Sequence, residues 1–217
     1  MSRHLMFALL VSLFAVSSVS TLSAQDAPKK VGKAAKKEKA PAAYKGGAAF
    51  TSPKAYTITP PAGWTSVSAY MTEEQLAQLP EKVRAQFRPE QVDVLFMDQA
   101  EQKLGSAFGD NVNVVVIAEV VPLDDKTVSE LKIMLTAEYS KVFDAFKMTD
   151  FTVIKLGAKP ALRVQGTYQL NGVDLHLHQT FIPGKTNSLV VTCTMDRARA
   201  KDRTPLCDGA AASVTFK

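Results

Sequence analysis

The sequence is poor in the residues on which most covalent catalysts and metal centres depend. Its 217 residues include two cysteines, three histidines and one tryptophan. The sequence contains no G-x-S-x-G, no H-E-x-x-H and no phosphate-binding glycine loop, and two cysteines are too few for a four-cysteine zinc site. We therefore expect a protein that is not an enzyme and that carries no cofactor.

The chain also lacks an N-terminal apolar run long enough to span a membrane. The run from Leu5 to Val16 has about 12 residues, whereas a spanning helix needs about 20. Arg3 precedes this run, and Ala24 provides a small residue before Gln25. These features predict a signal peptide over residues 1–24 and an exported protein, periplasmic or secreted. A short N-terminal membrane anchor is the alternative.

The two cysteines, Cys193 and Cys207, suit an oxidising compartment. A disulfide between them is expected, and it would contribute about 3 kcal/mol in the chain-entropy description. Two buried free thiols are the alternative, because spacing alone does not bring the Cα atoms together.

Positive charge is concentrated in one segment. Between Gln25 and Lys45 there are seven lysines against Asp26 and Glu38, and the remainder of the chain is close to neutral. Residues 25–49 are low in complexity and offer little to bury, so they predict a disordered Lys/Ala-rich linker. The linker is either a solvated spacer or an electrostatic contact to anionic surfaces. No aromatic residues are interleaved with its lysines, so no specific nucleic acid is expected.

The predicted domain, residues 50–217, is built around the stretch Asn111 to Val121. This stretch is dense in β-branched residues, and its alternation predicts a long central strand with Val112, Val114 and Val116 on one apolar face. Thr127 and Glu130 form a capping-box pattern, followed by an apolar stripe at helical spacing. We expect a helix over Val128–Phe146 that covers the valine face.

Other segments give weaker or shorter signals. Thr72 begins a second capping-box pattern, which predicts a helix to about Gln78 and a further helical turn from Pro80 through Phe87. Strands are expected over 55–59, 65–70, 92–97, 151–156, 161–170 and 189–195. The chain after Asp196 is polar and rich in arginine, and no regular element is predicted there before the final strand-like residues.

Asn171-Gly172 is the strongest hairpin signal in the sequence, and it predicts a type I′ turn with Leu170 opposite Val173. That register gathers polar residues on one face of the two strands. We interpret this face as a solvated binding surface. Its members are Arg163, Gln165, Thr167, Gln169, Asp174, His176, His178 and Thr180.

An alternative use of this surface is metal binding. His176 and His178 share one face of a strand, with alternate Cα atoms about 6.5 to 7 Å apart, so the two imidazoles are close enough to share a metal ion. A metal-binding protein or a metal-dependent hydrolase is therefore the second hypothesis.

The order of these features resembles the DcrB-like and PsbP-like proteins of the Mog/PsbP fold. The motifs that carry the resemblance are P-P-A-G-W from Pro60, N-V-N-V from Asn111, G-A-K-P-A-L-R-V-Q-G-T from Gly157, Q-T-F-I from Gln179 and S-L-V-V-T-C from Ser188. The resemblance covers residues 50–217. It implies an α+β domain: an antiparallel β-sheet of about six strands with helices packed on it, an α/β/α sandwich.

The resemblance also implies a non-enzymatic, exported protein that binds a partner. We expect a monomer whose partner is an unknown protein or envelope component.

Overall fold

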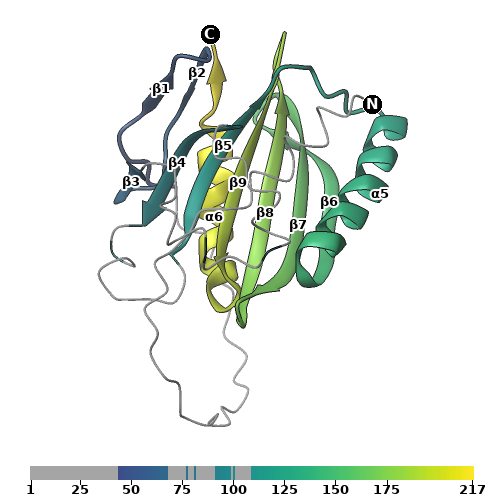
Figure 1. Cartoon of the computed structure of the whole chain (residues 1–217). Helices are drawn as coiled ribbons and strands as arrows, with labels where there is room; N and C mark the ends of the chain where they lie inside the picture. The colour runs from purple at the N-terminus through teal and green to yellow at the C-terminus, as the bar shows by residue number, and fades with distance from the viewer. Residues whose placement is uncertain (1–43, 68–76, 78–80, 82–90, 99, 101–108) are drawn as a thin grey trace, which may run out of the picture.

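The computed structural model describes residues 44–67, 77, 81, 91–98, 100 and 109–217. Within these residues the chain forms a large antiparallel sheet with a helix on each face, as Figure 1 shows. The predicted signal peptide and most of the predicted linker lie outside the described residues. So do the helices predicted between Thr72 and Phe87, apart from Ala77 and Glu81, which are both helical.

The large sheet has seven strands, all antiparallel to their neighbours, which confirms the predicted α+β class with one strand more than expected. Strands rich in β-branched and aromatic residues form it, in keeping with strand propensity. Their order across the sheet is β3 (Trp64–Val67), β4 (Val92–Asp98), β5 (Asn111–Ile117), β9 (Ser188–Asp196), β8 (Val173–Pro183), β7 (Lys159–Leu170) and β6 (Asp144–Leu156).

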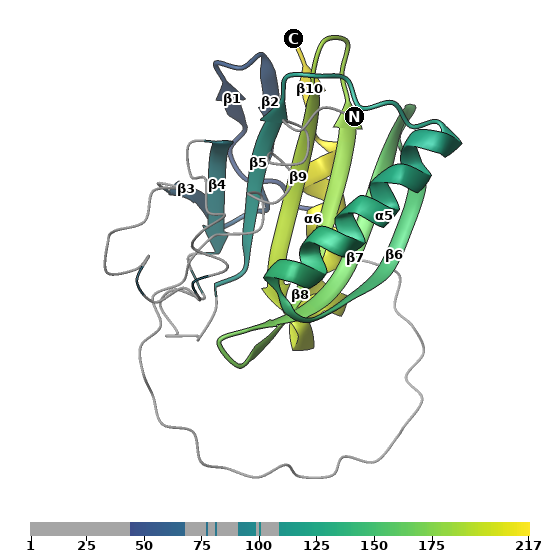
Figure 2. The ribbon, with the colours of Figure 1, turned by 45° about the vertical axis from the view of Figure 1, so that its right-hand side comes forward.

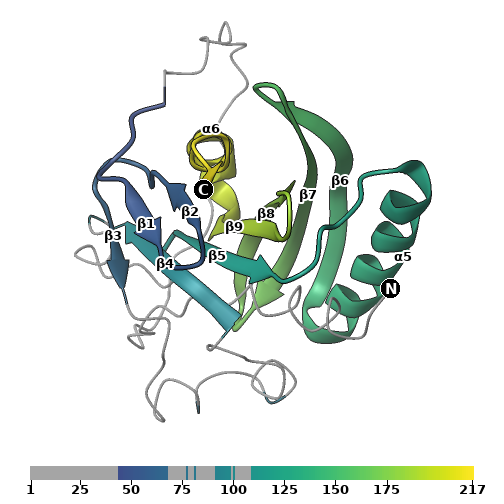
Figure 3. The same cartoon turned by 90° about the horizontal axis from the view of Figure 1, so that it is seen from above.

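Smaller elements complete the domain. Among the elements with described bounds, a three-stranded sheet lies beside the large one, and two helices and a 3-10 turn pack around the sheets. These elements are β1 (Phe50–Ser52), β2 (Tyr56–Ile58), β10 (Thr215–Phe216), α5 (Asp125–Val142), η2 (Arg197–Arg199) and α6 (Ala200–Ala212). Figures 2 and 3 show α5 against one face of the sheet and α6 against the other.

The two faces of β5 belong to different parts of the core. Val115 and Ile117 pack in the cluster that contains Leu131 and Leu135 of α5. Val112, Val114 and Val116 pack on the opposite face, in a cluster with Cys207 and Ala211 of α6. The prediction that the first helix covers the valine face is therefore wrong. Alternation identified both faces of the strand but carried no information about which element packs on each.

Helix α5 begins three residues earlier than the sequence pattern predicts. Asp124 is its N-cap: the Asp124 Oδ1 accepts a hydrogen bond from the Thr127 backbone N–H at 3.0 Å, and Thr127 Oγ1 donates to Asp124 Oδ2 at 2.8 Å. Asp is as good an N-cap as Thr, so the earlier residue takes the role. The helix ends at Val142 rather than Phe146, because the chain enters β6 at Asp144.

The hairpin between β7 and β8 is as predicted. Asn171 and Gly172 have φ values of 51° and 78°, as a type I′ turn requires, and Leu170 lies opposite Val173. Because this turn fixes the pairing, the cross-strand pairs also agree with prediction. They are Leu162–Phe181, Arg163–Thr180, Gln165–His178, Gly166–Leu177, Thr167–His176, Tyr168–Leu175 and Gln169–Asp174.

The folded domain begins no later than Tyr44, so the predicted boundary at Phe50 is too late. The Tyr44 hydroxyl donates to the Thr59 carbonyl oxygen at 2.6 Å, and the Gly47 N–H donates to the Pro60 carbonyl oxygen at 2.7 Å. A Cβ atom at Gly209 of α6 would collide with the Tyr44 ring, which therefore lies directly on that helix. The last residues of the predicted linker are thus part of the packed structure.

Helices in the described part of the chain include none that combines the length and the apolar character needed to cross a membrane.

Candidate functional site: the polar face of the β7–β8 hairpin

The polar face comprises the eight residues that the hairpin register gathers on one side of β7 and β8. Four of them, Arg163, Gln165, Thr167 and Gln169, are on β7, and each lies opposite one residue of β8. The β8 partners in the same order are Thr180, His178, His176 and Asp174. The structure therefore brings all eight predicted residues together.

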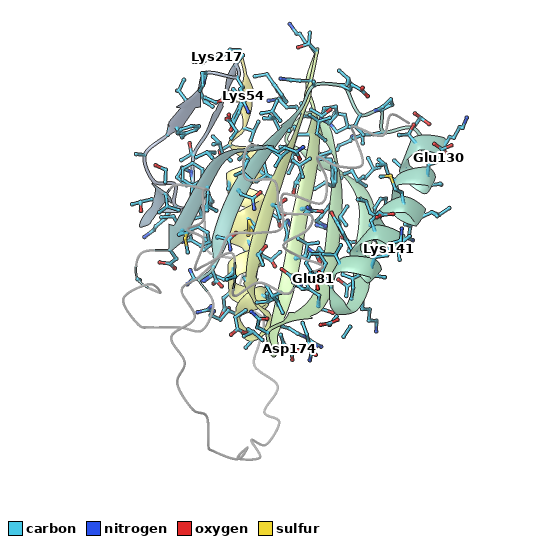
Figure 4. All side chains as sticks on the ribbon, in the orientation of Figure 1. Lys54, Glu81, Glu130, Lys141, Asp174 and Lys217 are labelled. Atoms are coloured by element: carbon cyan, nitrogen blue, oxygen red, sulfur yellow. A yellow bond between two sulfur atoms is a disulfide. The ribbon has the colours of Figure 1, made fainter. Side chains whose placement is uncertain are left out.

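Burial divides the polar face into two parts. His178 and Thr180 are each 1% exposed and His176 is 9% exposed, whereas Gln169 and Asp174 are exposed and the other three β7 residues are half-buried. The expectation of a solvated surface is wrong for His176, His178 and Thr180, which are buried. The five remaining residues keep exposed surface and form an outer strip, which consists of Arg163, Gln165, Thr167, Gln169 and Asp174. Figure 4 shows Asp174 at the end of the sheet where the hairpin turns.

Helix α6 lies against this face of the sheet, on the side of β8 and β9. A disulfide joins Cys207 of α6 to Cys193 of β9, with the two Cα atoms 6.1 Å apart. This confirms the predicted pairing. Because Cys193 lies opposite His178 in the β8–β9 register, the disulfide holds α6 beside the histidine.

Ion pairs hold the N-terminal part of α6 and the turn before it. Arg199 Nη2 lies 2.8 Å from Asp110 Oδ1, and Arg203 Nη2 lies 2.8 Å from Asp98 Oδ2. Asp110 is fully buried, so its charge must be compensated, and Arg203 Nε lies 3.1 Å from its other oxygen. These contacts join α6 to the end of β4 and the start of β5.

His178 contacts a polar group at each ring nitrogen. The Gln165 amide donates to Nδ1 at 2.9 Å, and Nε2 lies 3.0 Å from Asp208 Oδ1 of α6. With Nδ1 accepting, the ring proton is on Nε2, where the carboxylate faces it. The arrangement orients the imidazole rigidly between the sheet and the helix.

His176 is in a less favourable setting for charge. Burial lowers its pKa to about 4, and electrostatic repulsion from the neighbouring His178 and Arg197 acts in the same direction. The side chain is therefore neutral near pH 7, and its Nε2 has no hydrogen-bond partner among the described residues.

Arg163 of the outer strip forms an ion pair with Asp150 of the neighbouring strand β6. Arg163 Nε donates to Asp150 Oδ2 of β6 at 2.7 Å, and Thr152 Oγ1 donates to Asp150 Oδ1 at 2.6 Å. Partial burial opposes ionisation of Asp150, but the two hydrogen bonds and the charge of Arg163 outweigh it and lower the pKa of the carboxyl group. At the hairpin end, Gln169 Nε2 donates to Asp174 Oδ1 at 2.8 Å.

The geometry disfavours the metal hypothesis. Both nitrogens of His178 have polar neighbours, so a metal would have to displace Gln165 or Asp208. In the ranges that the structure describes, no group of three or more His, Cys, Asp or Glu side chains is arranged to hold a metal ion. Stable zinc sites need at least three protein ligands.

Sequence reasoning missed α6, and with it Asp208. The signal that would have found it is the spacing of Cys207, Ala210, Ala211 and Val214, all buried, at i, i+3, i+4 and i+7. Pro205 lies inside the helix and Gly209 follows it, and both residues argue against a helix in isolation. Packing against the sheet and the disulfide overrides that local preference.

No protein-family model and no curated protein matches the sequence. Solved structures do match. The cyanobacterial PsbP protein CyanoP of Synechocystis has a TM-score of 0.51 with 13% identity over 78% of this chain and 92% of its own. Mog1p of Saccharomyces cerevisiae, a Ran-binding protein, has a TM-score of 0.45 with 12% identity over 75% of this chain and 90% of its own.

LpqN of Mycobacterium tuberculosis, described as involved in cell envelope biogenesis, has a TM-score of 0.44 with 14% identity, over 76% of this chain and 86% of its own. At such identities a structural likeness establishes the fold alone, and only the CyanoP likeness is strong enough to carry that argument. The seven-stranded antiparallel sheet, its flanking helices and the match to CyanoP together show that this chain has a PsbP-like fold.

Proposed function

We propose that the protein is an exported, non-enzymatic binding or accessory protein of the cell envelope, and that it contacts its partner through the outer strip of the polar face. The partner is a protein or envelope component. The observation that carries the proposal is the division of the polar face, in which His178 and Thr180 are buried on the side that α6 covers, whereas every residue of the outer strip keeps exposed surface.

The outer strip has the properties of a contact surface. Its charged members are held in place by neighbours, Arg163 by Asp150 and Asp174 by Gln169, so little side-chain entropy is lost when a partner binds. Gln165 and Thr167 lie between these pairs and present amide and hydroxyl groups on a rigid strand. Sheet surfaces of this kind suit specific polar recognition better than non-specific adhesion.

Export is supported by the Cys193–Cys207 disulfide and by the N-terminal sequence. Disulfides persist in oxidising compartments, and the apolar run with the small residue at Ala24 is typical of a cleaved signal peptide. N-terminal sequencing of protein isolated from the producing cell tests this directly. We expect the mature chain to begin at Gln25, with no maleimide labelling of the two cysteines in urea until a reductant is added.

The contact surface is tested by substitutions that keep the fold. Thr167→Glu and Gln169→Lys alter the outer strip, and Thr186→Glu in the β8–β9 turn provides a matched exposed control. After crosslinking in intact cells, we expect the wild type and Thr186→Glu to give the same crosslinked species. The two outer-strip variants should not give these species. If folded outer-strip variants retain every crosslinked species, the surface is wrongly assigned.

A further inference from the structure

A second surface lies along the free edge of the large sheet, on β6. This strand is at the end of the strand order, and in the described part of the chain no strand pairs with its outer edge. Alternate residues of such an edge direct backbone N–H and C=O groups outward, where they can pair with another extended chain. At 13 residues β6 is long for an edge strand.

The pairing of β6 with β7 is irregular only in its first half. The register shifts between Asp144 and Lys147 and again between Met148 and Asp150, and bulges of this kind protect an edge from pairing. From Asp150 to Leu156 every residue pairs in sequence with β7. This regular half offers a straight template for an added strand.

A groove of about 520 Å³ runs between this edge and helix α5. Lys132 and Thr136 of α5 line one side, and residues Met148–Thr152 of β6 line the other. Residues from both faces of β6, such as Phe151 and Thr152, contribute to the lining, so the groove follows the outer edge of the strand. An open sheet edge with a helix beside it can accept an extended peptide as an added strand.

The groove and the adjoining end of β6 combine apolar side chains with two exposed lysines, Lys132 in the groove lining and Lys155 farther along the strand. Met148 and Phe151 pack partly into the core beneath it, and Val153 is 44% exposed. Lys132 and Lys155 are exposed, and neither ammonium forms an ion pair among the described residues. The carboxylate of Asp150 lies 2.7 Å from Arg163, so its charge is already compensated.

From this geometry we propose that the edge of β6 and the α5–β6 groove bind an extended acidic segment of another protein by strand addition. The main chain of the segment pairs with Asp150–Leu156. Its apolar side chains cover Val153 and enter the groove above Phe151, and its carboxylates face Lys132 and Lys155. This surface is on the α5 side of the sheet. It differs from the outer strip of the polar face, although the two meet at Asp150, which lines the groove and pairs with Arg163.

The probe is a blocked synthetic peptide of about ten residues with threonine at every second position and with valine and glutamate alternating at the others. Titration into ¹⁵N-labelled protein should shift the amide resonances of Thr152–Lys155 and of Lys132–Thr136. The same peptide with lysine in place of glutamate should bind at least about fivefold more weakly. Added salt should lower the affinity of the glutamate peptide.

Two variants separate the groove from the rest of the surface. Lys132→Glu should lower the affinity for the glutamate peptide by about fivefold or more. Lys126→Glu, an equal charge change in the first turn of α5, should have little effect on that affinity. Thr136→Trp fills the groove and should abolish binding without loss of the folded spectrum.

Three results would overturn the proposal. They are an unchanged spectrum at about 1 mM glutamate peptide, shifts confined to residues outside β6 and α5, and equal affinity for the two peptides. Sedimentation of the wild type also decides between occupants. A dimer that Thr136→Trp dissociates would show that a second copy of the chain, and not an acidic partner, covers this edge.

Discussion

His178 Nε2 of β8 and Asp208 Oδ1 of α6 lie 3.0 Å apart at the centre of the polar face. The contact is electrostatic, because neither atom has a hydrogen-bond partner of good geometry among the described residues, and the histidine side chain is 1% exposed. The contact links the helix to the sheet beside the disulfide. The sequence predicts that this hairpin face is exposed. Because α6 lies against the face at this contact, part of the face is covered in the folded protein.

Removing the carboxylate of Asp208 should destabilise the fold. Asp208→Ala would leave the buried Nε2–H of His178 without the carboxylate that faces it, so we expect the free energy of unfolding to fall by about 1–3 kcal/mol. Urea denaturation measures the change, and Asp202→Ala, at an exposed position of the same helix, is the control. Equal losses for the two variants would show that the His178–Asp208 contact contributes nothing.

The folded protein should lose stability below pH 6.5 because of His176. Its pKa is about 4 in the folded state and 6.5 in an unconstrained chain, so the unfolded state binds the proton first as the pH falls. His176 has no effect on stability above pH 6.5, and its penalty grows between pH 6.5 and about 4 to a few kcal/mol at most.

The variant His176→Gln cannot titrate and isolates this effect from the carboxylates that titrate in the same range. Denaturation at pH 7.5 and pH 4.5 should show a larger loss of stability for the wild type than for His176→Gln. Parallel losses would mean that His176 is protonated as readily in the folded state as in the unfolded state.

Zinc should bind weakly at the polar face. A metal at His178 would have to displace Gln165 or Asp208, so we expect no Zn(II) affinity tighter than about 10 μM by calorimetry. Tighter binding that is lost in His176→Gln and His178→Gln would restore the metal hypothesis in place of the binding surface.

The residues just before Phe50 should contribute to stability. A chain that begins at Ala43 keeps the Tyr44 hydrogen bond to Thr59 and the packing on Gly209, whereas a chain that begins at Phe50 loses both. We expect the shorter chain to melt at a lower temperature, by a difference equivalent to roughly 1–3 kcal/mol. The chain that begins at Ala43 should match one that begins at Gln25. Identical melting of all three would place the start of the domain at Phe50 after all.

Much of the candidate site was accessible from sequence because its geometry is local. Asn171-Gly172 prefers one turn type, that turn sets one register, and the register fixes which side chains of β7 and β8 are neighbours. The buried stripe of α5 was accessible for the same reason, since helical spacing places Leu131, Leu135 and Tyr139 on one face. The start of the helix was displaced because Asp124 and Thr127 are both suitable N-caps.

The helix α6 was only weakly indicated by its local sequence, through the apolar spacing of Cys207, Ala210, Ala211 and Val214. Its local sequence contains Pro205 and is only weakly amphipathic, so its stability depends on contacts with distant parts of the chain. Arg203 meets Asp98, 105 residues earlier, and Arg199 meets Asp110, 89 residues earlier. No pattern within the segment indicates such partners.

The sequence by itself determined most of the strands, the hairpin register, the amphipathic helix and the signal-like N-terminus, since each follows from preferences expressed within a few residues. It did not indicate β1 or the first half of β6. Tertiary structure alone decided which helix covers which face of β5 and how much of the polar face stays open. It also decided that the edge of β6 is free. These outcomes depend on which surfaces far apart in sequence bury the most apolar area and compensate each other's charges, and that is a property of the whole packed chain.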